Sequence, residues 1–149
     1  MNIQKMHILL FLFVIVLQVI TLKSFDMEPR DIVDIGGRRY YFSRVMVTPP
    51  EATDLCSEFE MTLAGLETME ESDNVTDYIT NTLGTTDNKY WTSGVRVYRR
   101  YMWGNSGLMF SYDNWAVDPD LSVNDTVQGH VYLHMGQLWE TYIKMDAYF

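Results

Sequence analysis

The stretch from Tyr90 to Asp120, YWTSGVRVYRRYMWGNSGLMFSYDNWAVDPD, constrains the fold more than any other part of this sequence. It contains three of the four tryptophans, together with several glycines and asparagines. Large aromatic side chains supply much of the buried area of a small domain, and glycine and asparagine accept the backbone angles of tight turns. The pattern predicts a strand, a tight turn, a second strand and then a long irregular loop that starts at Trp115. We expect this loop to carry the function, because binding residues often lie on loops held by a rigid scaffold.

The first 24 residues differ in composition from the rest of the chain. Lys5 forms a short basic region, and residues 7–22 are almost entirely apolar. An apolar segment of this length is typical of a signal peptide, whereas a membrane span needs about 20 apolar residues. We therefore expect a signal peptide over 1–24, a linker over 25–36 and one domain over 37–149. The protein would be secreted, with no membrane attachment after cleavage; a retained N-terminal anchor is the alternative.

The chain is acidic, with 20 acidic and 11 basic residues. Removing residues 1–24, which contain two lysines and no acid, changes the net charge from −9 to −11. This charge argues against nucleic acid and anionic membranes as partners and is compatible with cation binding. The sequence contains no nucleophile–base pair, phosphate-binding loop or carboxylate pair suited to acid–base catalysis. We therefore do not expect an enzyme.

Two further features bear on secretion. Asn74 and Asn124 begin N-x-[ST] sequons, which predict glycosylation in a secreted protein. Cys56 is the only cysteine, although small secreted domains usually contain cysteine pairs. A buried thiol, an intermolecular disulfide or an incomplete chain would each explain it.

The remaining periodicity predicts strands and two helices. Residues 39–47 alternate as a strand does. Thr48 and Glu51 form a capping box before a helix with Cys56 on its buried stripe, and Thr68 and Glu71 form another before a second helix that ends near Gly84. The chain from residue 89 onward reads as strands and loops, including a final strand near residues 147–149. The fold class is therefore α+β.

The order of these elements resembles the C-type lectin-like domain over residues 37–149, and the WTSG form of the core strand resembles insect members. The residues that carry the resemblance are Tyr40-Tyr41-Phe42, Ala52, Cys56, Leu63-Ala64, Val75, Tyr78-Ile79, Tyr90-Trp91-Thr92-Ser93-Gly94, Trp103, Gly107, Tyr112, Asn114-Trp115, Asp118-Pro119-Asp120, Val131-Tyr132-Leu133 and Trp139. The resemblance implies two helices, antiparallel strands and a long irregular loop. Members of this family bind sugars through calcium, or bind proteins, ice or other ligands, so the fold does not determine the activity.

In sugar-binding members, a calcium ion is held by oxygen ligands from the long loop and the strand after it. The resemblance places Asp118, Asp120, Gln128 and Glu140 at these positions, with a cis proline commonly found inside the first pair. The Asp-Pro-Asp triplet is nearest to the form associated with galactose, so galactose-type glycans are the expected ligands. Trp115 or Trp139 would support the loop.

The sequence also departs from the family pattern. Thr141 replaces a ligand carboxylate, and Gln128 offers only a neutral carbonyl. His130 and Lys144 stand at the inner cysteine positions, and the usual partner of Cys56 would follow Phe149. A protein-interaction domain that needs no calcium, or a truncated copy with no ligand, are therefore the alternatives to a carbohydrate-binding protein.

Two other motifs have ordinary explanations. His130 and His134 would lie about 13 Å apart along a strand, which is too far to share one metal ion. The run from Arg96 to Tyr101 is expected to form a hairpin with alternating exposed charges. We expect the methionines after residue 100 to fill the core.

Overall fold

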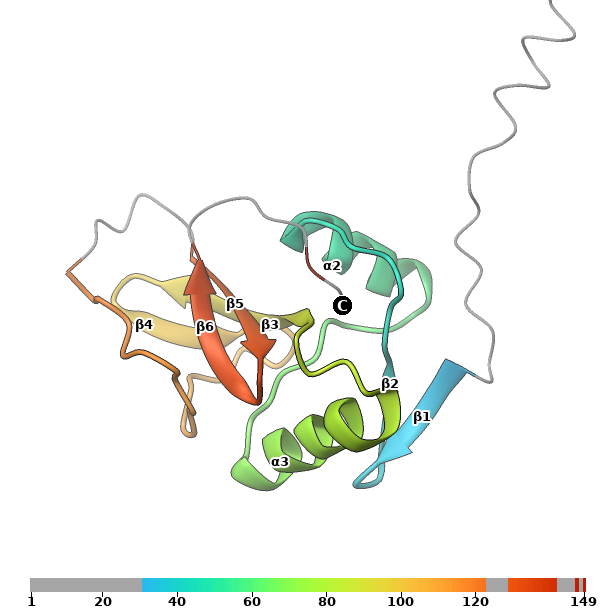
Figure 1. Cartoon of the computed structure of the whole chain (residues 1–149). Helices are drawn as coiled ribbons and strands as arrows, with labels where there is room; N and C mark the ends of the chain where they lie inside the picture. Colours follow the sequence, from blue (N-terminus) through green and yellow to red (C-terminus); the bar gives the residue numbers. More distant parts are fainter. Residues whose placement is uncertain (1–30, 123–128, 142–146, 148) are drawn as a thin grey trace, which may run out of the picture.

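The computed structural model describes residues 31–122, 129–141, 147 and 149. They form an antiparallel hairpin, two helices and a four-stranded sheet with the order β4-β3-β5-β6. Figure 1 shows the sheet on the left, the hairpin on the right, and the two helices above and below. The predicted α+β class is confirmed. No helix among the described residues is long and apolar enough to cross a membrane.

The hairpin pairs β1 (Ile32–Ile35) with β2 (Arg38–Tyr41). Gly36 and Gly37 form the turn, where φ is +59° and +82°, values that side chains disfavour. Strand β1 lies inside the segment that we expected to be a linker. The strand predicted over 39–47 ends at Tyr41, and the chain then bends at Arg44 and Val45.

Both helices begin at the predicted caps. In α2 (Pro49–Glu58) the Glu51 carboxylate accepts hydrogen bonds from the backbone and hydroxyl of Thr48. In α3 (Met69–Asp77) the Thr68 hydroxyl accepts from the Glu71 backbone. A wider helical turn, η2 (Tyr78–Leu83), follows α3 and ends at Gly84 in the left-handed conformation.

The sheet is built on β3 (Lys89–Val97), which pairs with β4 (Arg100–Trp103) on one side and β5 (His130–His134) on the other. Strand β6 (Gln137–Thr141) forms the outer edge beside β5. The register of β3 against β5 shifts between Trp91 and Val95. A bulge of this kind bends a strand locally, and it lies in the predicted core motif.

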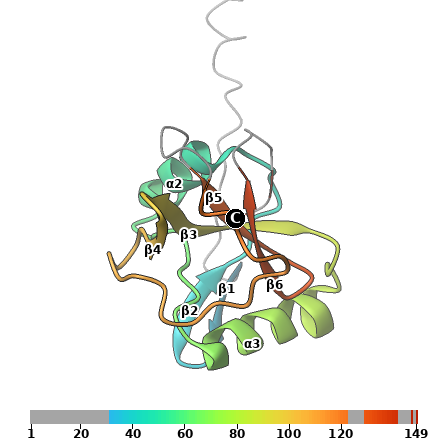
Figure 2. The same ribbon diagram turned by 90° about the vertical axis from the view of Figure 1, so that its left-hand side faces the viewer.

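Two apolar clusters hold these layers together. One is centred on Trp103, Leu66 and Leu138, and the other joins Ala52 and Cys56 of α2 to Trp91 and Phe149. Near the end of the chain, Ala147 pairs with Val47, and the Phe149 carbonyl accepts from the Ser43 backbone. Figure 2, which is turned by 90°, shows α2 near the top of the molecule and α3 at the bottom, beside the hairpin.

Candidate functional site

The long loop leaves β4 at Gly104 and returns to β5 at His130, and its described part runs to residue 122. Aromatic stacking fixes its first half: the rings of Trp103 and Phe110 lie 3.9 Å apart at an angle of 16°, and Phe110 stacks on Trp115. Backbone hydrogen bonds join Asn114 and Ala116 to Leu138 of β6. The loop therefore starts at Gly104 rather than at Trp115, and Trp115 is one of its anchors.

Arg96 of β3 is the residue beneath the outer part of this loop. Its side chain is 2% exposed. The Nε atom donates to the carbonyl of Tyr98 at 3.1 Å, and Nη1 donates to the carbonyl of Asp120 at 3.2 Å. One guanidinium group thus joins the β3–β4 turn to the tip of the long loop. The sequence reading of exposed charges in this hairpin is wrong for Arg96.

Glu140 of β6 supplies the opposite charge. Its Oε1 atom lies 3.9 Å from Nη1 of Arg96, and its side chain is 7% exposed. Gly129 makes room for both side chains, because a Cβ atom there would overlap Oε1 of Glu140 and lie 3.2 Å from Cβ of Arg96. Buried charges require a partner, and the lack of a side chain at Gly129 leaves room for the two side chains to approach each other.

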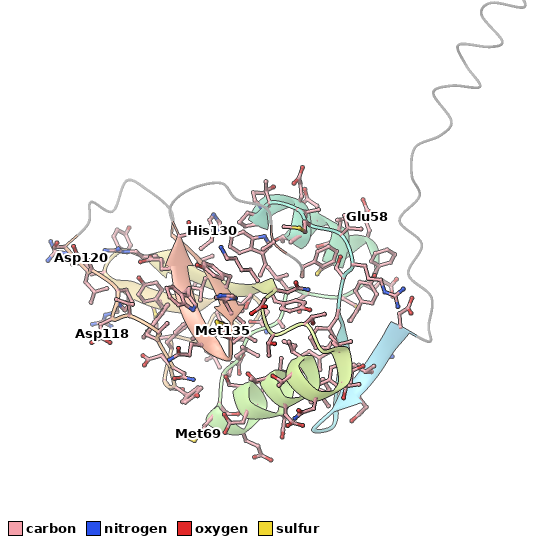
Figure 3. All side chains as sticks on the ribbon, viewed as in Figure 1. Glu58, Met69, Asp118, Asp120, His130 and Met135 are labelled. Atoms are coloured by element: carbon pink, nitrogen blue, oxygen red, sulfur yellow. The ribbon has the colours of Figure 1, made fainter. Side chains whose placement is uncertain are left out.

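Above the guanidinium, the turn and the loop present Tyr98, Asp118 and Asp120 to solvent. The Tyr98 side chain is 78% exposed, and its backbone has a φ of 55°, an uncommon value for an aromatic residue. Asp118 is exposed, whereas the Asp120 carboxylate accepts hydrogen bonds from the backbone and hydroxyl of Ser122. These hydrogen bonds, chiefly that from the Ser122 hydroxyl, lower the pKa of Asp120. Figure 3 shows both aspartates at the edge of the molecule opposite Glu58.

Comparisons with solved structures identify the fold of this chain. The carbohydrate-recognition domain of the mouse scavenger receptor C-type lectin has a TM-score of 0.67 at 18% identity, covering 83% of this chain and 95% of its own. Human lithostathine has a TM-score of 0.66 at 21% identity, with coverage of 85% and 95%. This chain has the C-type lectin-like fold.

A Ca2+-dependent type II antifreeze protein also has this fold, with a TM-score of 0.64 at 20% identity and coverage of 81% and 95%. No family model matches the sequence, and no curated protein matches it. The C-type lectin-like fold is thus shared with proteins whose names indicate different ligands. The site's own chemistry must therefore decide what this chain binds.

The predicted calcium ligands are only partly brought together. Glu140 and the backbone of Asp120 meet at Arg96, Asp118 points to solvent, and Gln128 lies outside the described residues. No cis peptide bond occurs in the described chain, so the bond between Asp118 and Pro119 is trans. Trp115 packs against Phe110 of the loop and Tyr101 of β4, whereas Trp139 belongs to β6 and stacks on Tyr132 of β5.

The residues present do not fit a calcium ion between the loop and β6. The Arg96 guanidinium lies 3.9 Å from the Glu140 carboxylate there, and Thr141 offers no carboxylate. A divalent ion about 5 Å from a guanidinium would be repelled by about 6–7 kcal/mol at an effective dielectric constant of about 20. No cluster of three or more potential metal-ligating side chains occurs within residues 31–122 and 129–141.

The other predicted residues have simple surroundings. Asn74 is exposed on α3, as a glycosylation site requires, and Asn124 lies outside the described residues. Cys56 is buried, and burial raises the pKa of its thiol to about 11. His130 and His134 stand at the two ends of β5. Met109 and Met135 are 48% and 63% exposed, so the prediction that they fill the core is wrong.

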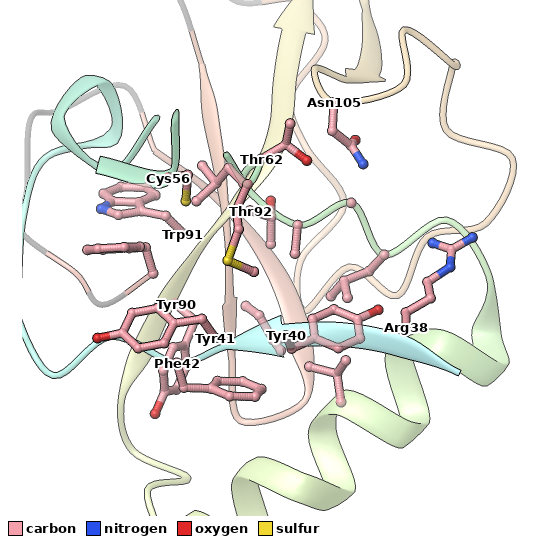
Figure 4. Close-up of a pocket in the computed structure, with 18 of the residues that line it drawn as sticks. Arg38, Tyr40, Tyr41, Phe42, Cys56, Thr62, Tyr90, Trp91, Thr92 and Asn105 are labelled. Atoms are coloured by element: carbon pink, nitrogen blue, oxygen red, sulfur yellow. The ribbon is translucent and has the colours of Figure 1, made fainter. Parts of the chain in front are cut away.

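The interior also contains a cavity of about 170 Å³ between β2, the segment before α3, and β3 (Figure 4). Cys56 and Trp91 line it on the α2 side, and Tyr40 and Arg38 line it at the other end. Its polar groups are used within the fold, since Thr92 donates to Val131 and Tyr40 donates to Glu71. This cavity is a space between the two core clusters and does not present the polar groups that a sugar needs.

Proposed function

We propose that this chain is a secreted carbohydrate-binding protein that holds its ligand on the surface of Tyr98, Asp118 and Asp120, without a bridging calcium ion. The single observation that carries the proposal is the Arg96 guanidinium, which joins the backbone of Tyr98 to that of Asp120. An exposed phenol and exposed carboxylates therefore share one surface. Lectin-like neighbours, including one named as a carbohydrate-recognition domain, support the same class of ligand.

The chemistry of this surface suits a sugar. An aromatic ring can cover the apolar face of a pyranose, and its amphipathic character tolerates the wet edge of the ligand. Carboxylates accept hydrogen bonds from hydroxyl groups, and such charge-assisted bonds are roughly twice as strong as neutral ones. Galactose-type glycans, which the resemblance implies for a calcium-bound site, are one class to test, and a surface without calcium sets no preference among sugars in advance.

The test is a glycan array probed with the full chain in the presence of a calcium chelator. We expect binding that falls at least about tenfold in Tyr98→Ala and in Asp118→Asn, a loss of about 1.4 kcal/mol for each. Met69→Ala and Glu58→Gln are matched controls, because both residues are exposed and lie away from the two aspartates (Figure 3). Binding that requires calcium, or that survives both loop substitutions, would contradict the proposal.

A protein partner is the second candidate. Val117 and Leu121 flank the two aspartates and are 68% and 44% exposed, and Leu108 is 57% exposed. Val117 and Leu121 are four positions apart in one loop, and neighbouring exposed apolar side chains can form a protein-interaction surface. This candidate predicts no glycan binding and a protein complex that is lost in Val117→Asp but retained in Met69→Asp.

A further inference from the structure

We propose that Arg96 is a built-in cation that holds the long loop in place, so that this part of the loop needs no metal ion. The inference concerns how the loop is held and does not rest on the identity of the ligand. Arg96 acts here as a positioning residue. It connects three parts of the chain that are far apart in sequence: the β3–β4 turn, the loop tip and β6.

The Arg96 guanidinium contacts oxygen atoms from three parts of the chain. The guanidinium donates to the carbonyls of Tyr98 and Asp120 and lies 3.9 Å from the Glu140 carboxylate. A cation surrounded by carbonyl and carboxylate oxygens is the arrangement that calcium adopts in proteins. Here the same kinds of oxygen atom face a planar guanidinium, whose five N–H groups form a fixed fork.

The Arg96 and Glu140 side chains are both buried. They are 2% and 7% exposed, respectively. Removing one member of a buried ion pair is strongly destabilising, because it leaves the other charge uncompensated. Burial of the pair therefore favours the arrangement in which the guanidinium stays bonded to the backbone of Asp120.

The space around the Arg96–Glu140 pair depends on Gly129. Gly129 lies directly against it, and any side chain at that position would collide with Glu140. The Gly129 carbonyl also accepts from the backbone of Arg96 at 3.0 Å. The end of the long loop is thus shaped around the ion pair, which gives a second, independent observation for its role.

The experiment measures hydrogen exchange of the loop, by mass spectrometry of peptides from residues 113–122, in the full chain. Arg96→Ala should exchange at least about tenfold faster there than the wild type, because local opening becomes easier when the pair is broken. Arg96→Lys keeps the charge but not the fork, and should give an intermediate rate. Calcium should leave the wild-type exchange unchanged.

Chemical rescue separates the charge from a general packing effect. Guanidinium chloride, far below denaturing concentrations, should slow loop exchange in Arg96→Ala, whereas the same concentration of sodium chloride should not. Arg38→Ala is the matched control: it removes an arginine that pairs with Glu71 at 2.7 Å on the hairpin side of the molecule. It should leave loop exchange unchanged.

Two results would overturn the inference. One is loop exchange that is equal in wild type and Arg96→Ala, and the other is calcium that slows exchange in the wild-type loop. If Arg96→Ala does not fold, Arg96→Gln provides the test, since it removes the guanidinium that donates to the Asp120 carbonyl while keeping a polar side chain that reaches toward Glu140. These readouts do not involve ligand binding, so failure of the proposed glycan function would leave them interpretable.

Discussion

The phenol of Tyr40 in β2 donates a hydrogen bond to Oε1 of Glu71 in α3, 2.5 Å away. The other carboxylate oxygen of Glu71 accepts from the backbone of Glu67, so one side chain connects the hairpin, the segment before α3 and the helix. Burial and this hydrogen bond raise the pKa of the Tyr40 phenol. A residue that reads in the sequence as a helix cap is therefore also the connection between two layers.

Replacing Glu71 by Ala should lower the free energy of unfolding by about 2–3 kcal/mol, because the Tyr40 hydroxyl and the Glu67 N–H would lose their acceptor. Urea denaturation of the two proteins measures this loss. Arg38 also pairs with this carboxylate, but the Arg38 side chain is 58% exposed. Arg38→Ala should therefore lower the free energy of unfolding by less than about 1 kcal/mol. Equal losses in the two variants would contradict this account.

Trp103 should be the most sensitive core position of the loop base. It is 1% exposed and stacks on Phe110, so Trp103→Ala should cost about 3–5 kcal/mol. Its Nε1 atom is buried without a hydrogen-bond partner in the described structure. Trp103→Phe removes this N–H and keeps a ring, and should therefore cost clearly less than the alanine variant. Thermal unfolding of both variants tests the order.

Cys56 should react slowly with thiol reagents in the native state and rapidly once the protein is unfolded. The reason is that burial raises the thiol pKa to about 11 from a usual value of 9.0, and only the thiolate reacts. Above pH 9 the unfolded chain releases this proton while the folded chain retains it. Stability therefore falls as the pH rises from 9 to 11, by at most about 2–3 kcal/mol from this group.

The control for that pH dependence is Cys56→Ala, which lacks the thiol. The difference in unfolding free energy between wild type and Cys56→Ala should shrink from pH 9 to pH 11. A constant difference would show that the thiol ionises equally in both states.

His130 should make the protein less stable in acid. Burial lowers its pKa below the usual 6.5, and its ring lies 6.4 Å from that of Trp91. As the pH falls below 6.5, the unfolded chain gains a proton on this residue that the folded chain resists, so stability is lost. NMR titration of His130 measures its pKa directly, and His130→Gln should weaken the acid dependence between pH 7.5 and 5. A midpoint at or above 6.5 would rule out this mechanism.

Much of the fold follows from local patterns. The capping boxes at Thr48 and Thr68 locate both helix starts, and Gly84 locates the end of the second helix. These signals involve residues three or four positions apart, so the sequence displays them directly. Gly94 shows what such local signals do not reveal, because a Cβ atom there would lie 2.8 Å from Cβ of Val131 on the neighbouring strand. Its role is close packing across the sheet, which only the fold reveals.

The residues of the candidate site were harder to predict from the sequence. Asp118, Asp120 and Glu140 could be chosen from the resemblance, but Arg96 could not, because its partner lies 44 positions later and the neighbouring Arg99 and Arg100 are exposed. Strand β1 was missed because four residues with one charge among them carry little periodic signal. An arginine at an inward position of a strand, in an otherwise acidic chain, is the one signal that could have indicated a buried ion pair.

The attachment of the loop through Arg96 has a consequence for where this protein could work. A metal-held loop loses its shape when its ion is diluted, chelated or displaced by protons, so its ligand is released by a change of compartment. A guanidinium is part of the chain and stays protonated at every physiological pH. A ligand held beside Arg96 would therefore remain bound in calcium-poor fluids, and its release would have to come from competition or degradation of the complex.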